Sequence, residues 1–576
     1  MSSYFRAVAI DFDGTLTVDG APADKVLTAI DGARAAGLKT ILATGRILTE
    51  LHDVFPMAEH YFDAIVAENG ATLLHEGVLH SLSAPVESEL DDALTGRGVP
   101  YRRGQVLLAT HAGFEDRIQQ EIHRLGLECR LVYNRGELMI LPPGVSKGSG
   151  LTKALEKIGI SCHNTIGIGD AENDHSLLGD CEFGVAVANA VEGLKRHADL
   201  VLEEANGDGV AALLDRLTRG DDALLLAARR RIRIGVFADG RPAEIAASRA
   251  NLLITGRSKS GKSFVAGMIA ERLMELGYSV CLIDPEGDYA SLGSLPGVEC
   301  LGRADMAPDI EEVRRFLLNR FGSVIVDLSL VETARQADCT QQLLRSLSAD
   351  RESSGLPHWI IIDEAHHALG LPGALAKILE EGQKGYCLVT YQPQVLERYL
   401  CTTMDHLLVL PGGRRLTGPD PISEVERIAG LSLSPRLDGV DTGHAILVDM
   451  GDSRQTHLIE LAPRRTAHVR HWHKYVQGKL PRRLRFSFSG RDGRGSSTAA
   501  NIQEFCDHVG DSAPDTVAFH GERLDFSRWI REAVQEDALA AEVRAIERRF
   551  IATNRTPGDI AALQSDVVRT IMRHYG

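Results

Sequence analysis

The chain has 576 residues, of which 44% are hydrophobic and 25% are charged, and its formal net charge is −16. This balance is typical of a soluble globular protein and excludes a disordered or fibrous chain, while the length requires several domains. No run approaches the roughly 20 apolar residues that cross a bilayer, and the start lacks a signal-peptide pattern, so we expect a cytoplasmic protein without membrane insertion.

The first part of the chain alternates β-branched strands with amphipathic helices. Strands are expected at AVAIDFD, KTILATG and DAIVAENG, with a helix at Lys25–Ala36. This alternation predicts an α/β fold with a parallel sheet covered on both faces. The pattern then changes to QVLLATH, a helix at Phe114–Leu125, CRLVYN and ELMILPP. We predict a domain at 1–218, with a core (1–81 and 144–218) and an inserted α/β cap (82–143).

A second α/β series follows a charged join, TRGDDALLLAARRRIRIGV, which we expect to be mobile. The series contains NLLITG, a helix at Lys262–Leu276, SVCLIDP, SVIVDLS, WIIIDE, YCLVTYQ and HLLVL. Beyond it come a basic segment with aromatic residues, a Gly/Ser-rich break (SGRDGRGSST) and helical patterns. We predict a second α/β domain at 228–462 and a small, mainly helical module within 463–576.

Four carboxylates are predicted at two strand ends of the first domain. Asp11 and Asp13 flank Phe12 at the end of AVAIDFD, and Asp170 and Asp174 follow another apolar strand in IGIGDAENDHSLL. Because ligands gather at the carboxyl ends of parallel strands, this position suits chemistry. Carboxylates so close together repel unless a cation lies between them, and Mg²⁺ prefers such hard oxygen ligands.

Thr44 in KTILATGR and Lys147 in GVSKGSGL add a hydroxyl and an ammonium group. Such groups stabilise the equatorial oxygens of a phosphoryl group during its transfer. The order of acid pair, Thr, Lys and acid pair resembles the four motifs of the haloacid dehalogenase (HAD) superfamily, which has a Rossmann-like core. The cap, with GDAEND and GVAVANA, resembles the Cof-type branch with a IIB cap, whose members mostly dephosphorylate sugar phosphates and other small molecules.

The resemblance implies a phosphohydrolase mechanism. Asp11 would be the nucleophile that forms an aspartyl-phosphate, and Asp13 the general acid that protonates the leaving oxygen and later activates water. Thr44, Lys147 and Asn173 would hold the phosphoryl group of a small phosphorylated substrate. The implied Mg²⁺ site consists of Asp11, Asp13 through its backbone carbonyl, Asp170 and Asp174.

A second phosphate site is predicted at NLLITGRSKSGKS, which fits G-x-x-x-x-G-K-[ST] between a strand and a helix. In such a P-loop the backbone N–H groups surround the phosphates of ATP, Lys262 reaches the β and γ oxygens, and Ser263 takes Mg²⁺. The expected nucleotide-binding residues of the loop are Gly256, Arg257, Ser258, Lys259, Ser260, Gly261, Lys262 and Ser263.

HWIIIDEAHH supplies the acidic strand end that a P-loop requires. Asp363 would hold the Mg²⁺ shell, and Glu364 would polarise the attacking water, as expected of an ATP hydrolase. His366 and His367 are interpreted as helix-start residues rather than metal ligands.

Two further segments, SVCLIDPEGDY and GYCLVTYQPQ, resemble the HerA/FtsK class of P-loop ATPases, whose domain is RecA-like. The resemblance covers residues 228–462 and implies that Gln392 senses the γ-phosphate. It also implies a homo-oligomer, typically a hexameric ring in which a neighbouring subunit contributes an arginine. The candidates, for each of which surface salt bridging is the alternative, are Arg398, Arg414, Arg415 and Arg427.

The segment PRRTAHVRHWHKYVQGKLPRRLRF interleaves basic residues with Trp472, Tyr475 and Phe486. This composition suits a phosphate-rich partner such as single-stranded nucleic acid. The alternative is a helix whose aromatic residues pack on the ATPase. Downstream, the core residues expected from helical spacing are Phe526, Trp529 and Ile530.

The sequence leaves three functions open. The first is a bifunctional enzyme, in which a Mg²⁺-dependent HAD phosphatase of a small metabolite is joined to a HerA-like ATPase. The second is a DNA-linked ATPase or translocase of host defence, whose HAD domain processes nucleic-acid or nucleotide phosphates. DNA-stimulated ATP hydrolysis distinguishes these two. The third is a polynucleotide kinase–phosphatase, against which Glu364 and the DPEGDY block count.

Overall fold

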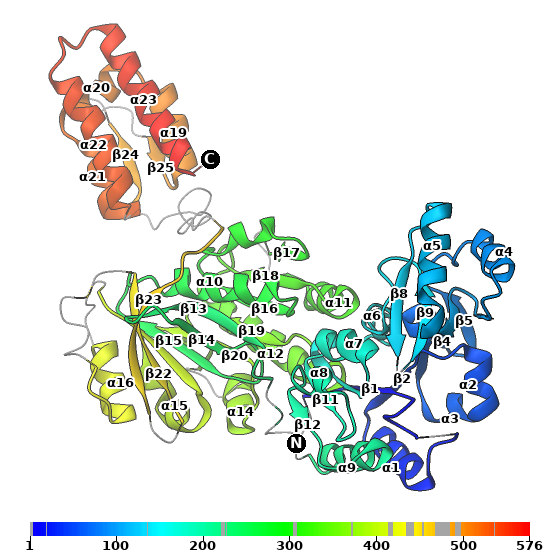
Figure 1. Ribbon diagram of the computed structural model, residues 1–576. Coiled ribbons are helices and arrows are strands. Elements are labelled where there is room, and N and C mark those ends of the chain that lie inside the picture. The colour runs from blue at the N-terminus through cyan, green and yellow to red at the C-terminus, as the bar shows by residue number, and fades with distance from the viewer. Residues whose placement is uncertain are drawn as a thin grey trace.

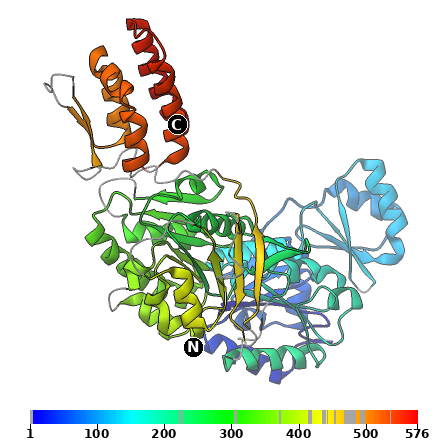
Figure 2. The same cartoon turned by 90° about the vertical axis from the view of Figure 1, so that its left-hand side faces the viewer.

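The computed structural model contains two large α/β bodies and a smaller helical one, which lies beyond the second body (Figures 1 and 2). Among the described residues, no helix is long and apolar enough to span a membrane. The structure describes residues 4–18, 20–134, 136–220, 225, 227–302, 308–369, 373–412, 419–433, 440, 443–451, 454–466, 484–489, 497–534 and 536–575.

The N-terminal body is built on an eight-stranded sheet, drawn in blue to blue-green in Figure 1. Its strands in spatial order are β12 (Leu200–Val201), β11 (Phe183–Ala186), β10 (Thr165–Gly169), β1 (Ala7–Asp11), β2 (Lys39–Ala43), β3 (Ala64–Ala67), β4 (Thr72–His75) and β5 (Val78–Ser81). The strands from β12 to β3 are parallel, and β4 and β5 are antiparallel additions. The predicted parallel sheet is therefore confirmed.

Helices complete this body and bury the sheet. They are α1 (Asp24–Ala35), α2 (Leu48–Val54), α3 (Ala58–Tyr61), α6 (Lys147–Ile158), α7 (His175–Asp180), α8 (Glu192–Lys195) and α9 (Asn206–Thr218). The apolar faces of α1, α6 and α9 share one core cluster with the central strands. All five residues of β1 are buried, which explains its continuous apolar run, because a central parallel strand has no solvent face.

A four-stranded antiparallel sheet forms the cap. Its order is β6 (Arg102–Arg103), β7 (Leu108–His111), β9 (Glu137–Leu141) and β8 (Arg130–Asn134), packed against α4 (Ser88–Gly96) and α5 (Glu115–Leu125). The buried carboxylate of Glu68, which follows β3, accepts backbone N–H bonds from Gln105, Val106 and Leu107 at 2.8, 2.8 and 3.0 Å. Glu68 therefore connects the end of β3 to the segment that leads into β7 of the cap.

Replacing Glu68 with Gln should loosen the cap, because a neutral amide cannot offer two anionic oxygens to three N–H groups. Hydrogen bonds to charged groups contribute about 1.5–3 kcal/mol, so amide exchange at residues 105–107 should become roughly tenfold faster or more. Native-state hydrogen exchange measures this effect. Glu89→Gln, on the exposed face of α4, is the matched control and should change nothing. Equal exchange in both variants would contradict the role of Glu68.

The central body contains an eleven-stranded sheet. Its strands in spatial order are β14 (Pro242–Ala246), β13 (Arg231–Phe237), β23 (Thr456–Leu461), β22 (His444–Asp449), β21 (His406–Leu410), β15 (Leu252–Gly256), β20 (Tyr386–Thr390), β19 (Trp359–Ile362), β16 (Val280–Asp284), β18 (Ser323–Asp327) and β17 (Val298–Leu301). The strands from β21 to β17 are parallel, and the others add antiparallel pairs.

Two core clusters cover the two faces of this sheet. Leu253 and Leu252, neighbours on β15, belong to different clusters, as expected for alternating side chains. Helix α10 (Lys262–Glu275) packs on one face. On the other face lie α11 (Ile310–Arg320), α12 (Thr333–Ser354), α13 (His366–Leu369), α14 (Ala374–Glu380), α15 (Glu397–Thr403) and α16 (Pro421–Ala429).

The C-terminal module has its own core. It contains β24 (Phe486–Phe488), β25 (Ser497–Ala499), α19 (Ile502–Asp511), α20 (Pro514–Glu522), α21 (Asp525–Trp529), α22 (Asp537–Ile551) and α23 (Pro557–Tyr575). Phe526, Trp529 and Ile530 are buried in this core, as predicted. Phe486 also packs there, rather than on the ATPase or toward solvent, because it lies on β24 against Phe505. Trp472 and Tyr475 lie outside the described residues.

Part of the charged join packs against the N-terminal body, because Arg229 and Arg230 donate to backbone carbonyls at the end of α7 and just after it. For example, one guanidinium nitrogen of Arg229 lies 2.8 Å from the oxygen of Leu178 and another 3.0 Å from that of Gly179. The following residues form β13, so the charged run enters the second sheet directly.

Candidate active sites

The two acid pairs of the N-terminal sheet meet at neighbouring strand ends. β1 ends at Asp11 and lies beside β10, which is followed by Asp170. Gly14 turns the chain away with φ +81°, and a Cβ on it would lie 2.5 Å from Asp170 Oδ2. Only glycine permits this close approach.

Lys147 lies between the two acid groups. Ser146 and Ser149 form a reciprocal cap at the start of α6, which fixes Lys147 in the first helical turn. Its Nζ donates to Asp11 Oδ1 at 2.5 Å and to Asp174 Oδ1 at 2.7 Å. Burial opposes its charge, but the two carboxylates outweigh this effect and raise the pKa of Lys147. Lys147 is therefore a fixed, buried cation.

Asp11, Asp170 and Asp174 form a compact group of buried carboxylates. Each offers one oxygen, and these oxygens all lie within 4.8 Å of one another. Burial, and then the charge of Asp174, raise the pKa of Asp11 well above its ordinary value. The other oxygen of Asp174 accepts N–H bonds from Asp170 and Ala171, both at 2.9 Å, which fixes its direction. A divalent cation would relieve this repulsion.

Asp13 points to a different partner. Its carboxylate forms a two-pronged ion pair with Arg46, whose Nη2 lies 2.6 Å from Oδ1 and whose Nε lies 2.8 Å from Oδ2. Both residues line a cavity of about 420 Å³ between the sheet and the cap. The cap contributes Arg102, Asn134 and Glu137 to its wall. Asp13 thus lines the cavity, whereas Asp11 is buried and is not one of the lining residues.

Thr44 and Asn173 lie at the same edge of the sheet. Thr44 follows β2, is fully buried, and accepts the backbone N–H of Arg46 at 3.1 Å. The amide nitrogen of Asn173 donates to Asn69 at 3.1 Å and lies 3.6 Å from the position of a Cβ on Gly45. All the side chains predicted for the first site are therefore brought to one strand edge.

The P-loop follows β15 and begins α10. Gly256 has φ +152°, and a Cβ there would lie 2.8 Å from the carbonyl oxygen of Leu410, so the neighbouring strand requires glycine. Lys262 Nζ donates to the carbonyl oxygen of Arg257 at 3.1 Å and lies 5.8 Å from the ring centre of Tyr391. Arg257 reaches outward and pairs with Asp420 at 2.7 Å. The remaining predicted residues, Ser258, Lys259, Ser260, Gly261 and Ser263, lie in the loop or at the helix start.

Asp363 lies at the end of β19 beside the DPEGDY loop. Asp284 shapes this loop by accepting the backbone N–H groups of Gly287 and Tyr289 at 2.7 and 3.0 Å. The Tyr289 hydroxyl then donates to Asp363 Oδ2 at 2.7 Å. Burial, and then the charge of Asp288, raise the pKa of Asp363 to about 6.

Glu364 has a backbone conformation that is unusual for a non-glycine residue, with φ +46°. Burial, and then the charge of Asp363, raise its pKa to about 8. His366 Nδ1 lies 3.2 Å from Glu364 Oε2 and 3.2 Å from the Thr390 hydroxyl, and burial lowers the pKa of His366 to about 4. Backbone strain and a shifted carboxyl pKa both occur often at functional sites.

Gln392 follows β20, which lies between the P-loop strand and the Asp363 strand. Its backbone N–H donates to the Thr390 hydroxyl at 2.9 Å. Of the candidate arginines, Arg427 pairs with Glu397 and Glu424, and Arg398 is exposed. Arg414 and Arg415 lie outside the described residues.

Sequence reasoning missed Arg46 and Tyr289. Arg46 ends KTILATGR, two residues after Thr44, and Tyr289 ends the DPEGDY block. Their partners Asp13 and Asp363 are far from them in the sequence, although the strands that precede each pair are neighbours in the sheet. Only the sheet order brings them together.

Comparison with known proteins defines both bodies. A family model described as haloacid dehalogenase-like hydrolase matches residues 8–88 and 106–214, and one described as AAA domain matches residues 246–391. The N-terminal part of the chain belongs to the haloacid dehalogenase-like hydrolases, and a P-loop ATPase-type domain is fused to it. The predicted fold class and fusion are thereby confirmed.

Individual relatives match the N-terminal domain. The chain is 32% identical over 224 residues to a phosphoglycolate phosphatase of Methanothermobacter thermautotrophicus, covering 37% of this chain and 98% of that protein. It is 30% identical over 229 residues to a phosphoglycolate phosphatase of Archaeoglobus fulgidus, covering 37% and 96%. A solved haloacid dehalogenase-like hydrolase of B. subtilis is 20% identical, with a TM-score of 0.33 and coverage of 37% and 100%.

Proposed function

We propose that the N-terminal domain is a Mg²⁺-dependent phosphatase of small phosphorylated metabolites and that the central domain is a HerA-like ATP hydrolase. The observation that carries the first half is the buried group of Asp11, Lys147 and Asp174, together with the Asp13–Arg46 pair on the cavity wall. In this proposal a carboxylate nucleophile, a fixed cation and an acid–base group lie at one strand edge.

In this proposal Asp11 attacks the phosphorus atom and forms an aspartyl-phosphate, while the leaving oxygen departs toward the cavity. Asp13, on the cavity wall, protonates that oxygen and then removes a proton from the water that hydrolyses the intermediate. Arg46 orients the Asp13 carboxyl for both steps. Lys147 and the Thr44 hydroxyl stabilise the phosphoryl oxygens, and Asn173 supports them from the same edge.

The donor set fits Mg²⁺. Asp11, Asp170 and Asp174 supply three buried carboxylate oxygens within 4.8 Å of one another, and the carbonyl of Asp13 follows in the chain. Hard oxygen ligands of this kind suit Mg²⁺, whose charge would neutralise phosphoryl oxygens.

The cavity and the relatives suggest the substrate class. Arg46 pairs with Asp13, and Arg102 pairs with Glu50 and Glu137, so the wall of the cavity is lined by ion pairs that suit a small polar substrate. The relatives named above are phosphoglycolate phosphatases. Among candidate substrates of the phosphatase domain, we therefore rank small phosphorylated acids first and sugar phosphates second.

A substrate panel tests this proposal. With Mg²⁺ we expect kcat/KM for 2-phosphoglycolate or hexose phosphates to exceed that for phosphorylated oligonucleotides by about 100-fold or more, because the cavity selects small molecules. Excess EDTA should abolish turnover, and Mg²⁺ should restore it. Preferred hydrolysis of oligonucleotide 3′- or 5′-phosphates would favour the DNA-linked alternative instead.

For the central domain we propose that Asp363 and Ser263 hold Mg²⁺, that Glu364 activates water, and that Gln392 senses the γ-phosphate. The supporting observation is the position of β20, which places Gln392 between the P-loop and Asp363. We propose a homo-oligomeric ring, with exposed Arg398 a better candidate than the paired Arg427 for the arginine supplied to a neighbour. Most of the basic segment lies outside the described residues, so the DNA-linked and kinase–phosphatase alternatives stay predictions of the sequence.

A further inference from the structure

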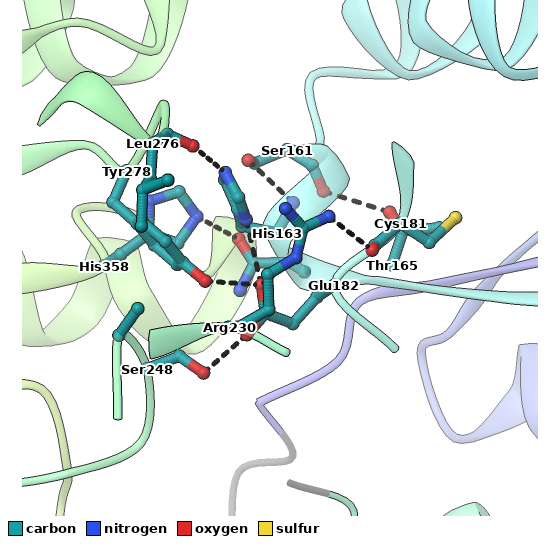
Figure 3. Close-up of polar contacts among 12 residues, drawn as sticks. Ser161, His163, Thr165, Cys181, Glu182, Arg230, Ser248, Leu276, Tyr278 and His358 are labelled. Atoms are coloured by element: carbon teal, nitrogen blue, oxygen red, sulfur yellow. Dashed lines mark hydrogen bonds and ion pairs between the residues drawn. The ribbon is translucent and has the colours of Figure 1, made fainter. Parts of the chain in front are cut away.

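A buried polar network joins the phosphatase domain to the ATPase domain (Figure 3). At its centre Glu182 Oε2 accepts the Tyr278 hydroxyl at 2.7 Å and lies 2.9 Å from His163 Nδ1. Glu182 Oε1 accepts the hydroxyl of Ser248 at 2.5 Å. Glu182 and His163 come from the phosphatase side, and Ser248 and Tyr278 from the ATPase side.

His163 is held between two acceptors. Its Nδ1 faces the Glu182 carboxylate and its Nε2 lies 2.9 Å from the carbonyl oxygen of Leu276, so each ring nitrogen lies beside an acceptor. The ring also stacks on Tyr278, with centres 3.8 Å apart. Leu276 follows the last turn of α10, where the helix leaves carbonyl oxygens without partners inside the helix. Burial opposes the charge of Glu182, but its hydrogen bonds, led by that of His163, lower its pKa.

A second set of bonds lies beside the first. His358 Nδ1 accepts the backbone N–H of Ser279 at 2.8 Å, so its Nε2 donates to Asn164 Oδ1, 3.1 Å away. Burial lowers the pKa of His358, which keeps this ring neutral. A Cβ on Gly355 would lie 2.5 Å from the Asn164 side chain, so the two surfaces touch closely. Arg6 donates to the carbonyl oxygen of Arg351 at 2.7 Å.

These contacts form a specific interface between the phosphatase domain and the ATPase domain. Glu182, His358 and Asn164 are 2%, 2% and 0% exposed. The bonds are short and directional, and those that cross between the domains join Glu182 to Ser248 and Tyr278, His163 to Leu276, and Asn164 to His358. A shift of one domain against the other would leave buried donors and acceptors unpaired, which is unfavourable. The interface therefore fixes one arrangement of the two domains.

The elements that start at this interface end at the two active sites. On the phosphatase side, β1 and β10 follow Arg6 and Asn164 and lead to Asp11 and Asp170. Each of these strands has five residues and spans about 16 Å.

On the ATPase side, α10 runs from the P-loop to Leu276, and β19 runs from His358 to Asp363. The fourteen residues of α10 span about 21 Å. A path of roughly 37 Å along a strand of the phosphatase sheet and then along α10 therefore joins the two sites. An influence of one site on the other can pass along these packed elements.

We propose that the network of His163, Glu182, Tyr278 and His358 makes the two domains one thermodynamic unit, so that nucleotide bound at the P-loop stabilises the phosphatase strands. A ligand that binds only the folded state raises the free energy of unfolding by mass action. Exchange of an amide in the phosphatase domain slows by the same mechanism if that amide exchanges only when the nucleotide-bound domain also opens. If the domains were independent, nucleotide binding would slow amide exchange in the ATPase domain only. The proposal goes beyond the proposed function and needs nucleotide binding only, so phosphatase turnover plays no part in its test.

The test is hydrogen exchange of the full chain with and without Mg²⁺–ADP, read at residues 4–11 and 161–169. At about 100 times the dissociation constant we expect exchange there to slow at least fivefold, because coupling between sites is typically 5–150-fold. Lys262→Ala, which removes the P-loop cation, should show no slowing. If ADP protected residues 252–275 of the wild type but left exchange at residues 4–11 and 161–169 unchanged, the proposal would be overturned. Failure of the wild type to bind ADP would overturn it as well.

Two interface variants locate the coupling. Glu182→Gln removes the charge that His163 faces, and Tyr278→Phe removes one hydroxyl while the ring stays stacked. In both, the slowing at 161–169 should fall below about twofold while protection at 252–275 persists. Glu192→Gln, on exposed α8 of the same domain, is the matched control and should behave as wild type. Retention of the full slowing in both interface variants would overturn the assignment, and Tyr278→Phe decides the matter if Glu182→Gln does not fold.

Discussion

Asp11→Asn should lower phosphatase turnover by at least about 10³-fold, because an amide cannot form the aspartyl-phosphate. The change preserves shape, and Lys147 retains its bond to Asp174, so the domain should remain folded. The measurement is release of inorganic phosphate from the best substrate of the panel. ATP hydrolysis in the same variant should stay within about twofold of wild type, because Asp11 lies at the far end of β1 from the interface.

The matched control is Asp208→Asn, which removes an exposed carboxylate that pairs with Lys25 on the surface of the same domain. It should leave phosphatase turnover unchanged, because exposed pairs contribute little. If Asp11→Asn kept a tenth of the wild-type turnover, Asp11 would not be the nucleophile. If it removed ATP hydrolysis as well, the observation would point to a fold defect or a shared active site.

Lys262→Ala should lower ATP hydrolysis by about 10²–10³-fold, the usual effect of removing one charged group from a transition state. Lys262 is the buried cation of the P-loop, and the sequence has no other lysine between Gly261 and Asp363. Its loss should also weaken ATP binding, because the β and γ oxygens lose their counter-charge. Steady-state ATP hydrolysis and nucleotide titration separate these two effects.

The control for this variant is Lys377→Ala, on the exposed face of α14, which should hydrolyse ATP as wild type does. Phosphatase turnover of Lys262→Ala, measured without nucleotide, should be unchanged. Normal ATP hydrolysis in Lys262→Ala would contradict the assignment of the P-loop. A loss of phosphatase turnover without nucleotide would show that the cation also supports the fold across the interface.

The sequence predicted both chemical centres because their residues follow local rules. Apolar strands that end in Asp11, Asp170 or Asp363 have a fixed polarity, and chemistry in parallel sheets gathers at their carboxyl ends. The P-loop is a short, contiguous pattern whose glycines are required by backbone geometry at Gly256 and Gly261. Such features need no knowledge of distant contacts.

The pairs that orient those centres could not be predicted in the same way. Arg46 holds Asp13 across 33 residues, and Tyr289 holds Asp363 across 74. Glu68 reaches the cap across 37–39 residues. Each of these residues is an ordinary polar residue in the sequence, and its partner is set by strand order and register, which no local pattern specifies.

Periodicity and motif spacing are local properties of the chain, so the sequence predicts two phosphate sites, their strand–loop–helix contexts and the order of the domains. How the two halves meet depends on the tertiary structure. His163, Glu182, Tyr278 and His358 carry no motif, yet they form a buried, directional interface between the sheets. The physical reason is that hydrogen bonding between buried groups depends on where distant segments come together, and that is fixed only when both domains have folded.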